Sequence, residues 1–284
     1  MLPEPVHALI RMALREDTGT GDITGLCFIP EDKQASASIR AKETGIVAGL
    51  AIAVEVFREL DPRVGIKAVA AEGDLVHRGD VVMTLEGPAR SILTGERTAL
   101  NFLQRLSGIA TQTRRYVDAV AEWPVQILDT RKTTPGWRWL EKMAVRTGGG
   151  TNHRTGLYDM VMVKDNHLST AGDTGELQAG IDKAYALQPG IRIELEADSV
   201  EQVRKFLTLR GVDVIMLDNM TLEEMRDSVA LCRGSGVKLE ASGGVTLARL
   251  PEIAATGVDY ISSGALTHSV QALDLSLDFA GTAL

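Results

Sequence analysis

The chain has 284 residues and is poor in cysteine and in aromatic side chains, with two cysteines and 4% Phe, Trp and Tyr. Cys27 and Cys232 lie far apart and form no CxxC pair, which argues against a disulfide framework and a thiolate metal site. Each is therefore interpreted as a small buried hydrophobic residue. This cysteine usage favours a reduced, cytoplasmic location.

Long apolar runs are also absent. The most apolar segment, residues 46–54, is followed by Glu55 and is too short to span a bilayer. Residues 1–22 carry acidic side chains and lack the apolar core of a signal peptide. We therefore expect a cytoplasmic protein that does not interact with membranes.

Several common site motifs are missing as well. The sequence has no Walker A motif and no GxGxxG after a predicted strand, so nothing supports binding of ATP or a dinucleotide. His153 and His167 form no zinc pattern such as HExxH. The net charge of −8 and the pI of about 5.2 argue against a general nucleic-acid surface. A local basic pocket stays possible.

The first hundred residues are predicted to form a helix and several strands. The helix covers residues 5–15, and extended segments follow at residues 35–42, 65–70 and 81–85. The glycine turns of residues 72–80 resemble those of lipoyl and biotinyl carrier domains. Such carriers need an attachment lysine at a hairpin tip, and the candidate tip has none, so a structural β-sandwich is favoured over a carrier module.

The rest of the chain alternates between strands and helices. A helix is predicted over residues 93–121, and later helices over residues 198–209 and 222–232. Short apolar strands are predicted at residues 125–128, 160–163, 191–195, 212–217, 237–239 and 258–262. Strands and helices that alternate every 20 to 35 residues indicate parallel βα units. Six such strands, with one or two more, would close or nearly close an α/β barrel.

Each predicted strand ends in polar or glycine residues, where a barrel carries its catalytic groups. These endings comprise residues 129–132, 164–167, Glu194 with Glu196, Asp218 with Asn219, residues 240–244, and residues 263–265. Residues 129–164 contain seven Lys or Arg and three acids, a net charge of +4 in a chain whose remainder is −12. Guanidinium and ammonium groups suit carboxylates and phosphates. The sequence therefore predicts a pocket for a small, multiply anionic substrate.

Alternatives stay open for several of these residues. Arg138, Lys142 and Arg146 have fourfold spacing, so they suit a solvated helix face as well as a site. The glycines at 148–150, 243–244 and 264 either let backbone amides approach an anion or form structural turns. Glu196 and Asp218 either face sugar hydroxyls and Mg²⁺ through water, or pair with Arg or Lys inside the barrel.

Several motifs resemble those of the quinolinate phosphoribosyltransferase family, in order from residues 21–24 to residues 273–276. They are ERTALN (96–101), LSGIAT (106–111), DTRKTTPG (129–136), GGGTNHR (148–154), KDNH (164–167), MLDN (216–219), ASGG (241–244) and GVDYISSGALTH (257–268). The resemblance implies an α/β fold with an N-terminal α/β sandwich in residues 1–111 and an open α/β barrel in residues 112–269. The tail, residues 270–284, is expected to pack back on the sandwich.

The resemblance also implies the reaction. Quinolinate and phosphoribosyl pyrophosphate give nicotinate mononucleotide, CO₂ and pyrophosphate, with Mg²⁺, a pentosyl transfer of the EC 2.4.2.19 type in NAD synthesis. It implies a homodimer in which Arg97 reaches into the partner's site. Around quinolinate it implies Thr130, Arg131, Lys132, His153, Arg154 and Lys164, and around the ribose and the metal Glu196 and Asp218. Lys132, Lys164, Glu196 and Asp218 are expected to be catalytic, and residues 242–244 (Ser242, Gly243, Gly244) and 263–265 (Ser263, Gly264, Ala265) to hold the 5′-phosphate.

Three features depart from the family pattern without removing a charge: Ser263 replaces a valine, residues 193–198 replace a more valine-rich strand, and Trp137 and Trp139 replace smaller residues. They put the fine substrate preference in doubt. One alternative is a related protein associated with molybdate transport, which shares the fold. Arg97, Arg154 and Lys164 together argue against it.

Overall fold

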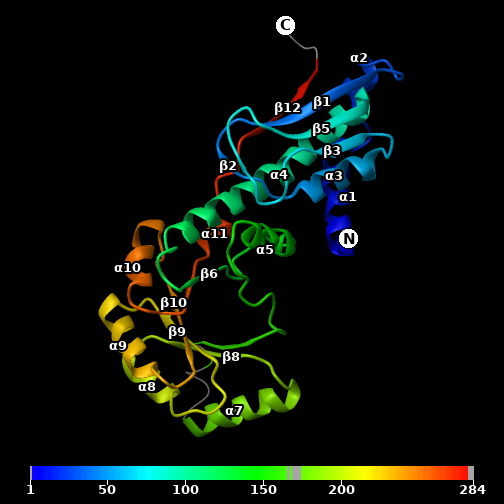
Figure 1. Ribbon diagram of the computed structural model, residues 1–284. Helices are drawn as coiled ribbons and strands as arrows, with labels where there is room; N and C mark the ends of the chain where they lie inside the picture. The colour runs from blue at the N-terminus through cyan, green and yellow to red at the C-terminus, as the bar shows by residue number, and fades with distance from the viewer. Residues whose placement is uncertain (1, 165–166, 168–173, 281–284) are drawn as a thin grey trace. The chain divides into compact units, whose positions relative to one another are not determined.

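A computed structural model of the chain describes residues 2–164, 167 and 174–280 (Figure 1). By their internal contacts the residues form two compact units. The first, here called the sandwich unit, comprises Met1–Arg114, Thr134–Gly149 and Ser269–Leu284, and the second, the barrel unit, comprises Arg115–Thr133 and Gly150–His268. By their contacts, residues 134–149 belong to the sandwich unit, although we expected them in the barrel. The domain limits at residues 111 and 269 stay a prediction.

The sandwich unit is built on a four-stranded antiparallel sheet. Its order is β12 (Leu275–Phe279), β1 (Gln34–Ala41), β5 (Val81–Pro88) and β3 (Gly65–Ala68), so the C-terminal strand pairs with β1. The small pair β2 (Gly45–Ile46) and β4 (Leu75–Val76) lies outside this sheet. The helices are α1 (Glu4–Thr18), α2 (Ile23–Phe28), α3 (Leu50–Leu60), α4 (Ala89–Asp118) and α5 (Arg138–Thr147). The last residues of α4 are counted in the barrel unit.

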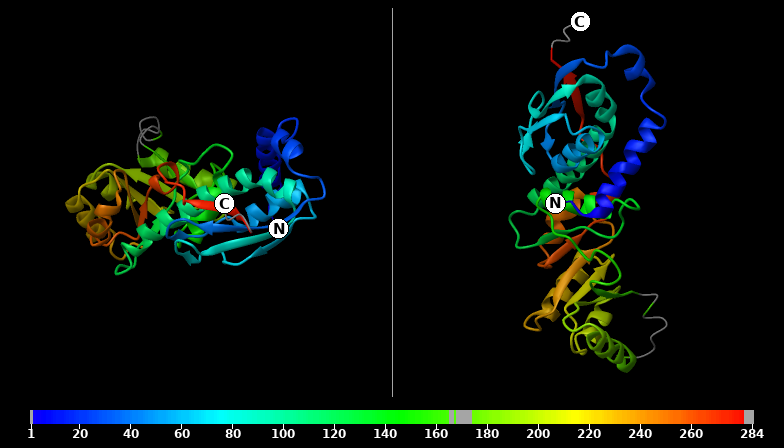
Figure 2. Two further views of the ribbon diagram at one scale, coloured as in Figure 1. Left: turned by 90° about the horizontal axis from the view of Figure 1, so that it is seen from above. Right: turned by 90° about the vertical axis from the view of Figure 1, so that its right-hand side faces the viewer.

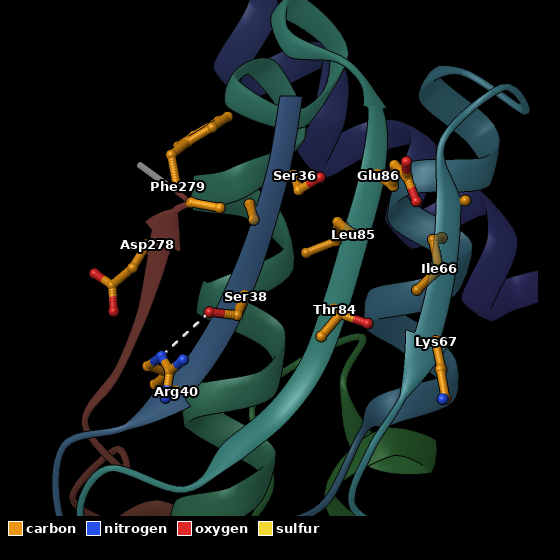
Figure 3. A pocket seen from close by; sticks show the side chains of 13 residues that line it. Ser36, Ser38, Arg40, Ile66, Lys67, Thr84, Leu85, Glu86, Asp278 and Phe279 are labelled. Carbon is orange, nitrogen blue, oxygen red and sulfur yellow. Dashed lines mark hydrogen bonds between the residues drawn. The ribbon is translucent and has the colours of Figure 1, made fainter. Parts of the chain in front are cut away.

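The two faces of this sheet differ because side chains alternate along a strand. Ala37, Ile39 and Leu85 are buried, and α3 and α4 lie behind the sheet in Figure 3. On the front face lie Ser36, Ser38, Arg40, Lys67, Thr84 and Glu86, which line a shallow hollow of about 650 Å³ (Figure 3). The hollow mixes both signs of charge, as expected of a solvated sheet face.

The barrel unit is a six-stranded parallel sheet. Its order is β6 (Gln126–Leu128), β11 (Tyr260–Ser262), β10 (Lys238–Ser242), β9 (Val214–Asp218), β8 (Ile193–Ala197) and β7 (Val161–Val163). Each strand lies within two or three residues of its predicted position. Among the described residues β6 and β7 each pair with one strand only, so the barrel is open as expected.

Helices connect these strands and lie along the outside of the sheet (Figures 1 and 2). They are α7 (Thr174–Leu187), α8 (Val200–Phe206), α9 (Leu222–Cys232), the 3₁₀ turn η1 (Leu247–Arg249), α10 (Leu250–Ala254) and α11 (Ala265–His268). A capping box at Thr221 and Glu224 fixes the start of α9. The carboxyl ends of all six strands therefore meet at one rim.

Three further expectations have clear outcomes. Cys232 is buried as predicted, but Cys27 is exposed, because it lies on the solvent-facing helix α2 beside the exposed Leu26 and Phe28. The prediction of two buried cysteines was therefore wrong for Cys27.

Helix α3 was not predicted. Across the part of the chain that the structure describes, we find no helix with the length and apolarity needed to cross a membrane.

Candidate active site

A cavity of about 650 Å³ opens at the carboxyl ends of the barrel strands. It gathers most of the predicted site residues: Thr130, Arg131, Lys132, His153, Arg154, Lys164, Glu196, Asp218, Ser242, Gly243 and Gly244. Its lining also includes Met162, Met216, Asn219, Glu240 and Ser262, which the site prediction left out. Four Lys or Arg side chains thus share one cavity with three carboxylates. An anionic ligand would meet a set of donors from several strands.

The loop after β6 is held in place by a buried carboxylate. Asp129 is fully buried, and its Oδ1 accepts the His153 amide at 2.8 Å while its Oδ2 accepts the Asn152 side-chain amide at 2.6 Å. These bonds join the segment that carries Arg131 and Lys132 to the one that carries His153 and Arg154. Asp129 therefore organises the cationic side of the cavity.

His153 lies between two buried carboxylates, Glu194 on β8 and Glu240 on β10, the two strands that flank β9. Its Nε2 is 3.0 Å from Glu194 Oε2 and 3.3 Å from Glu240 Oε2. Burial lowers the pKa of His153, but hydrogen bonds and charges from Glu194 and Glu240 outweigh this and raise it to about 9. Burial raises the pKa of Glu194, and the Glu240 charge adds to the effect. The carboxylates thus favour a proton on Nε2.

The cations of the cavity are crowded. Burial lowers the pKa of Arg154, and the charge of Arg131 lowers it further. The buried Nε of Arg131 has no hydrogen-bond partner among the described residues. Opposite them, Lys164 donates a short hydrogen bond to Glu196, a carboxylate on β8. Among the described residues, Arg131 Nε is therefore a buried donor without a partner, whereas Lys164 Nζ is paired with Glu196.

The far side of the cavity is a glycine turn after β10. Gly243 has φ +86° and Gly244 φ +57°, both in the left-handed region that favours glycine. Asn219 also has a positive φ, 55°, and its amide nitrogen donates to Ser242 O at 2.9 Å. Its side chain donates to Asp218 Oδ2 at 2.9 Å. The turn therefore fixes Asp218 and exposes backbone where a phosphate could approach.

The last predicted segment lies beside the cavity without lining it. Ser263 is buried, and its amide donates to Leu128 O at 3.1 Å. A Cβ on Gly264 would lie 2.8 Å from Lys132 Cδ and 2.9 Å from His268. Gly264 thus leaves room for Lys132, and the segment supports the loop after β6. Its predicted role at the phosphate stays a prediction.

Two family models match the chain. The model of the N-terminal domain of quinolinate phosphoribosyl transferase matches residues 22–107, and that of the C-terminal domain matches residues 109–278. The chain belongs to the quinolinate phosphoribosyl transferase family.

Individual relatives agree with this membership. The chain is 48% identical over 263 residues to a probable nicotinate-nucleotide pyrophosphorylase (carboxylating) of Bacillus subtilis, covering 93% of this chain and 89% of the relative. It is 45% identical to the chloroplastic enzyme of that name from Arabidopsis thaliana, with coverages of 96% and 82%. The solved nicotinate-nucleotide pyrophosphorylase of Francisella tularensis superposes with a TM-score of 0.91 at 38% identity, over 98% of each chain.

Some expected site residues of this family member lie elsewhere. Arg97 is on α4 in the sandwich unit, as are Arg138, Lys142 and Arg146 on α5. Of the two readings left open for these residues, the solvated helix face does not hold for Lys142, which is buried, whereas Arg146 is exposed. Asp165 and Asn166 of the KDNH motif lie outside the described residues.

The site prediction left out Glu240 and the buried role of Glu194. Each lies two positions before a predicted site residue on the same strand, Glu240 before Ser242 and Glu194 before Glu196. Because side chains alternate along a strand, this spacing places them on the cavity face, one layer deeper. That spacing was the available signal.

Proposed function

We propose that the chain transfers the phosphoribosyl group of phosphoribosyl pyrophosphate to quinolinate with loss of CO₂. The products are nicotinate mononucleotide and pyrophosphate, so the enzyme serves NAD synthesis as a carboxylating nicotinate-nucleotide pyrophosphorylase. One observation carries this proposal. In this chain, a member of the family, Arg131, Arg154 and Lys164 line the same cavity as the glycine turn after β10.

The cations suit the dicarboxylate. Arg131 and Arg154 offer forked donors, and Arg131 Nε is buried without a partner among the described residues. Thr130, Lys132, His153 and Lys164 line the same cavity. Gathering these charges before substrate arrives lowers the cost of bringing two anionic substrates together.

The acids and the glycine turn suit the other substrate. Gly243 and Gly244 let backbone approach the 5′-phosphate, with Ser242 beside them. As pyrophosphate leaves, the ribosyl centre becomes cationic, and the carboxylates of Glu196 and Asp218 stabilise that charge. When the ring carboxylate departs as CO₂, its electron pair stays on the ring carbon, and Lys132 and Lys164 stabilise the negative charge. A proton from solvent then binds this carbon and gives nicotinate mononucleotide.

We assign the metal to the same acids. Mg²⁺ prefers oxygen ligands and keeps several waters, and Glu196 and Asp218 both present carboxylate oxygens to the cavity. Because Glu196 is already paired with Lys164, an indirect contact through water or substrate fits this donor set. Bound Mg²⁺ would neutralise the charge of the departing pyrophosphate.

The assay of this proposal is product formation. Purified protein with quinolinate, phosphoribosyl pyrophosphate and Mg²⁺ is expected to release nicotinate mononucleotide and CO₂ in equal amounts, and excess EDTA is expected to stop turnover. Nicotinate in place of quinolinate is the control substrate. Turnover of nicotinate with none of quinolinate would overturn the assignment.

The proposal includes a cytoplasmic homodimer in which Arg97 completes the partner's site. Arg97→Ala and Lys164→Ala proteins are then each expected to be inactive, while mixed dimers regain activity in the one site that has both residues. Mixing is checked by native mass spectrometry of differently tagged subunits. Mixed dimers that form and stay inactive would refute the shared site.

A further inference from the structure

Three buried side chains form a charged floor beneath the cavity. Glu194 is 0% and Glu240 1% exposed, and the side chain of His153 is 8% exposed. Both carboxylates lie within 3.3 Å of His153 Nε2. Burying two carboxylates next to a site for anions is costly and would repel the ligand, unless they serve the groups around them.

A metal ion is one reading of this cluster, since the three ligand atoms lie within 4.8 Å of one another. The histidine argues against it. The Arg154 amide donates to His153 Nδ1 at 2.7 Å, which opposes the second proton that the raised pKa of the ring favours on Nδ1. Nε2 faces the carboxylates and carries a proton in both the neutral and the charged ring, whereas a metal would need a bare Nε2. The cluster is therefore built around a protonated Nε2.

The ring also fixes its neighbour. Residues 152–154 belong to no helix or strand, so side-chain contacts must hold them. His153 is held through its amide by Asp129 and through Nε2 by the two acids, and its Nδ1 accepts the Arg154 amide. The charge of Glu194 also favours the Arg154 cation, which Arg131 and burial disfavour. Ring orientation and charge balance both act on Arg154.

We propose that Glu194 and Glu240 are positioning residues that fix the His153 ring and, through it, the Arg154 guanidinium that receives quinolinate. Loss of both charges would free the ring to change its proton and its rotamer. It would also remove the Glu194 charge, which together with that of Asp159 balances Arg131 at Arg154. We therefore expect weaker binding of quinolinate and unchanged binding of phosphate at the glycine turn. This inference rests on the proposed function for its substrate.

The test compares Glu194→Gln, Glu240→Gln and the double variant with Asp213→Asn. Asp213 is the matched control, because it lies just before β9 and its carboxylate accepts the Ile193 amide at the amino end of β8, opposite the end that forms the cavity. Charged and titratable neighbours of the ring are Glu194, Glu240, Asp129 and Arg154, with Arg192 and Tyr260 lining a small cavity behind it. Nitrogen-15 NMR of labelled histidine reads the ring proton, with His153 assigned by substitution.

In wild-type protein, Nε2 of His153 is expected to stay protonated from pH 6 to pH 8. In the double variant, we expect a mixture of rings with the proton on Nε2 and rings with the proton on Nδ1. The KM for quinolinate is expected to rise about tenfold to a hundredfold, because charge-assisted hydrogen bonds that hold the site are lost. The KM for phosphoribosyl pyrophosphate is expected to stay nearly unchanged. Asp213→Asn leaves the ring and both KM values as in wild type.

An unchanged ring proton in the double variant, or equal rises of both KM values, would overturn the positioning role. The single variants supply the same comparison if the double variant does not fold. Wild-type protein inert toward quinolinate would instead refute the proposed function, and the ring proton would still decide whether the acids hold His153.

Discussion

The glycine turn after β10 allows a matched test of what glycine contributes to the site. Gly243 and Gly244 are adjacent and both have positive φ, so an alanine at either position adopts a left-handed conformation. The surroundings differ. A Cβ on Gly243 would lie 2.2 Å from Asn219 Oδ1 and 2.5 Å from its Cγ, whereas a Cβ on Gly244 would meet only Arg249 Nη1, at 3.5 Å.

The expected loss of stability follows from these contacts. Left-handed backbone costs an L-residue about 1–2 kcal/mol, and the lower entropy of the unfolded alanine chain offsets about 0.4–1 kcal/mol of it. Gly244→Ala should therefore lower the free energy of unfolding by about 1 kcal/mol. Gly243→Ala must also displace Asn219. That adds about 1 kcal/mol for its hydrogen bond to Asp218 and about 1 kcal/mol for an altered rotamer.

Urea unfolding of the two alanine variants measures the difference directly. We expect Gly243→Ala to unfold with a free energy about 2 kcal/mol below that of Gly244→Ala, at equal m-values. Because Asn219 fixes Asp218, Gly243→Ala should also raise the KM for phosphoribosyl pyrophosphate more than Gly244→Ala does. Free energies of unfolding within about 0.5 kcal/mol of each other would refute the steric argument.

Two further predictions concern ion pairs. Lys164→Gln should weaken quinolinate binding about tenfold or more, whereas Glu196→Gln removes the acid that occupies Lys164 and should leave binding equal or tighter while lowering kcat. Calorimetry with quinolinate alone checks this, and equal weakening by both would contradict it. In the sandwich unit, the hydrogen bond from the Arg63 side chain lowers the pKa of Asp61, with burial opposing. Because the folded pKa is depressed, Asp61 stabilises the fold above about pH 4 and loses this effect as the pH falls. The difference in unfolding free energy between wild type and Asp61→Asn should thus shrink from pH 5 to pH 3, and a constant difference would count against it.

The sequence predicts the barrel strands well because parallel strands are buried on both faces and therefore appear as short apolar runs. It fails at α3, whose segment Leu50–Leu60 is rich in Val, Ile and Ala. Such a run suits a buried strand as well as a buried helix, and periodicity alone cannot separate them. Burial of Ile52, Ala53, Val56 and Phe57 together gives the helical face only once the neighbouring elements are in place.

Site residues were predictable where one strand end carries them, and not where distant segments meet. Arg131, Lys164 and Asp218 each follow a predicted strand, and the carboxyl ends of barrel strands are where catalytic residues are expected. The contact of His153 with Glu194 and Glu240 joins three segments, and the two-residue spacing on β8 and β10 indicates the acids but not the histidine between them. Residues 134–149 were assigned to the barrel for a similar reason. Glu141 on α5 accepts from Arg105 on α4 at 3.1 Å, a contact within the sandwich unit that spacing cannot reveal.

The charges of the cavity explain how a chain of net charge −8 keeps an anion site assembled without its ligand. Acids on the barrel strands balance individual cations: Glu196 pairs with Lys164, and the charge of Glu194 supports Arg154. The two acids differ in depth. Glu194 is fully buried, whereas Glu196 lines the cavity, where a bound ligand can compete with it for Lys164. Lys164 has three N–H donors, so in the proposed reaction a quinolinate carboxylate shares Lys164 with Glu196 and weakens that pair. In that reaction, binding of one substrate would thereby loosen the acid that serves the ribose and Mg²⁺ of the other.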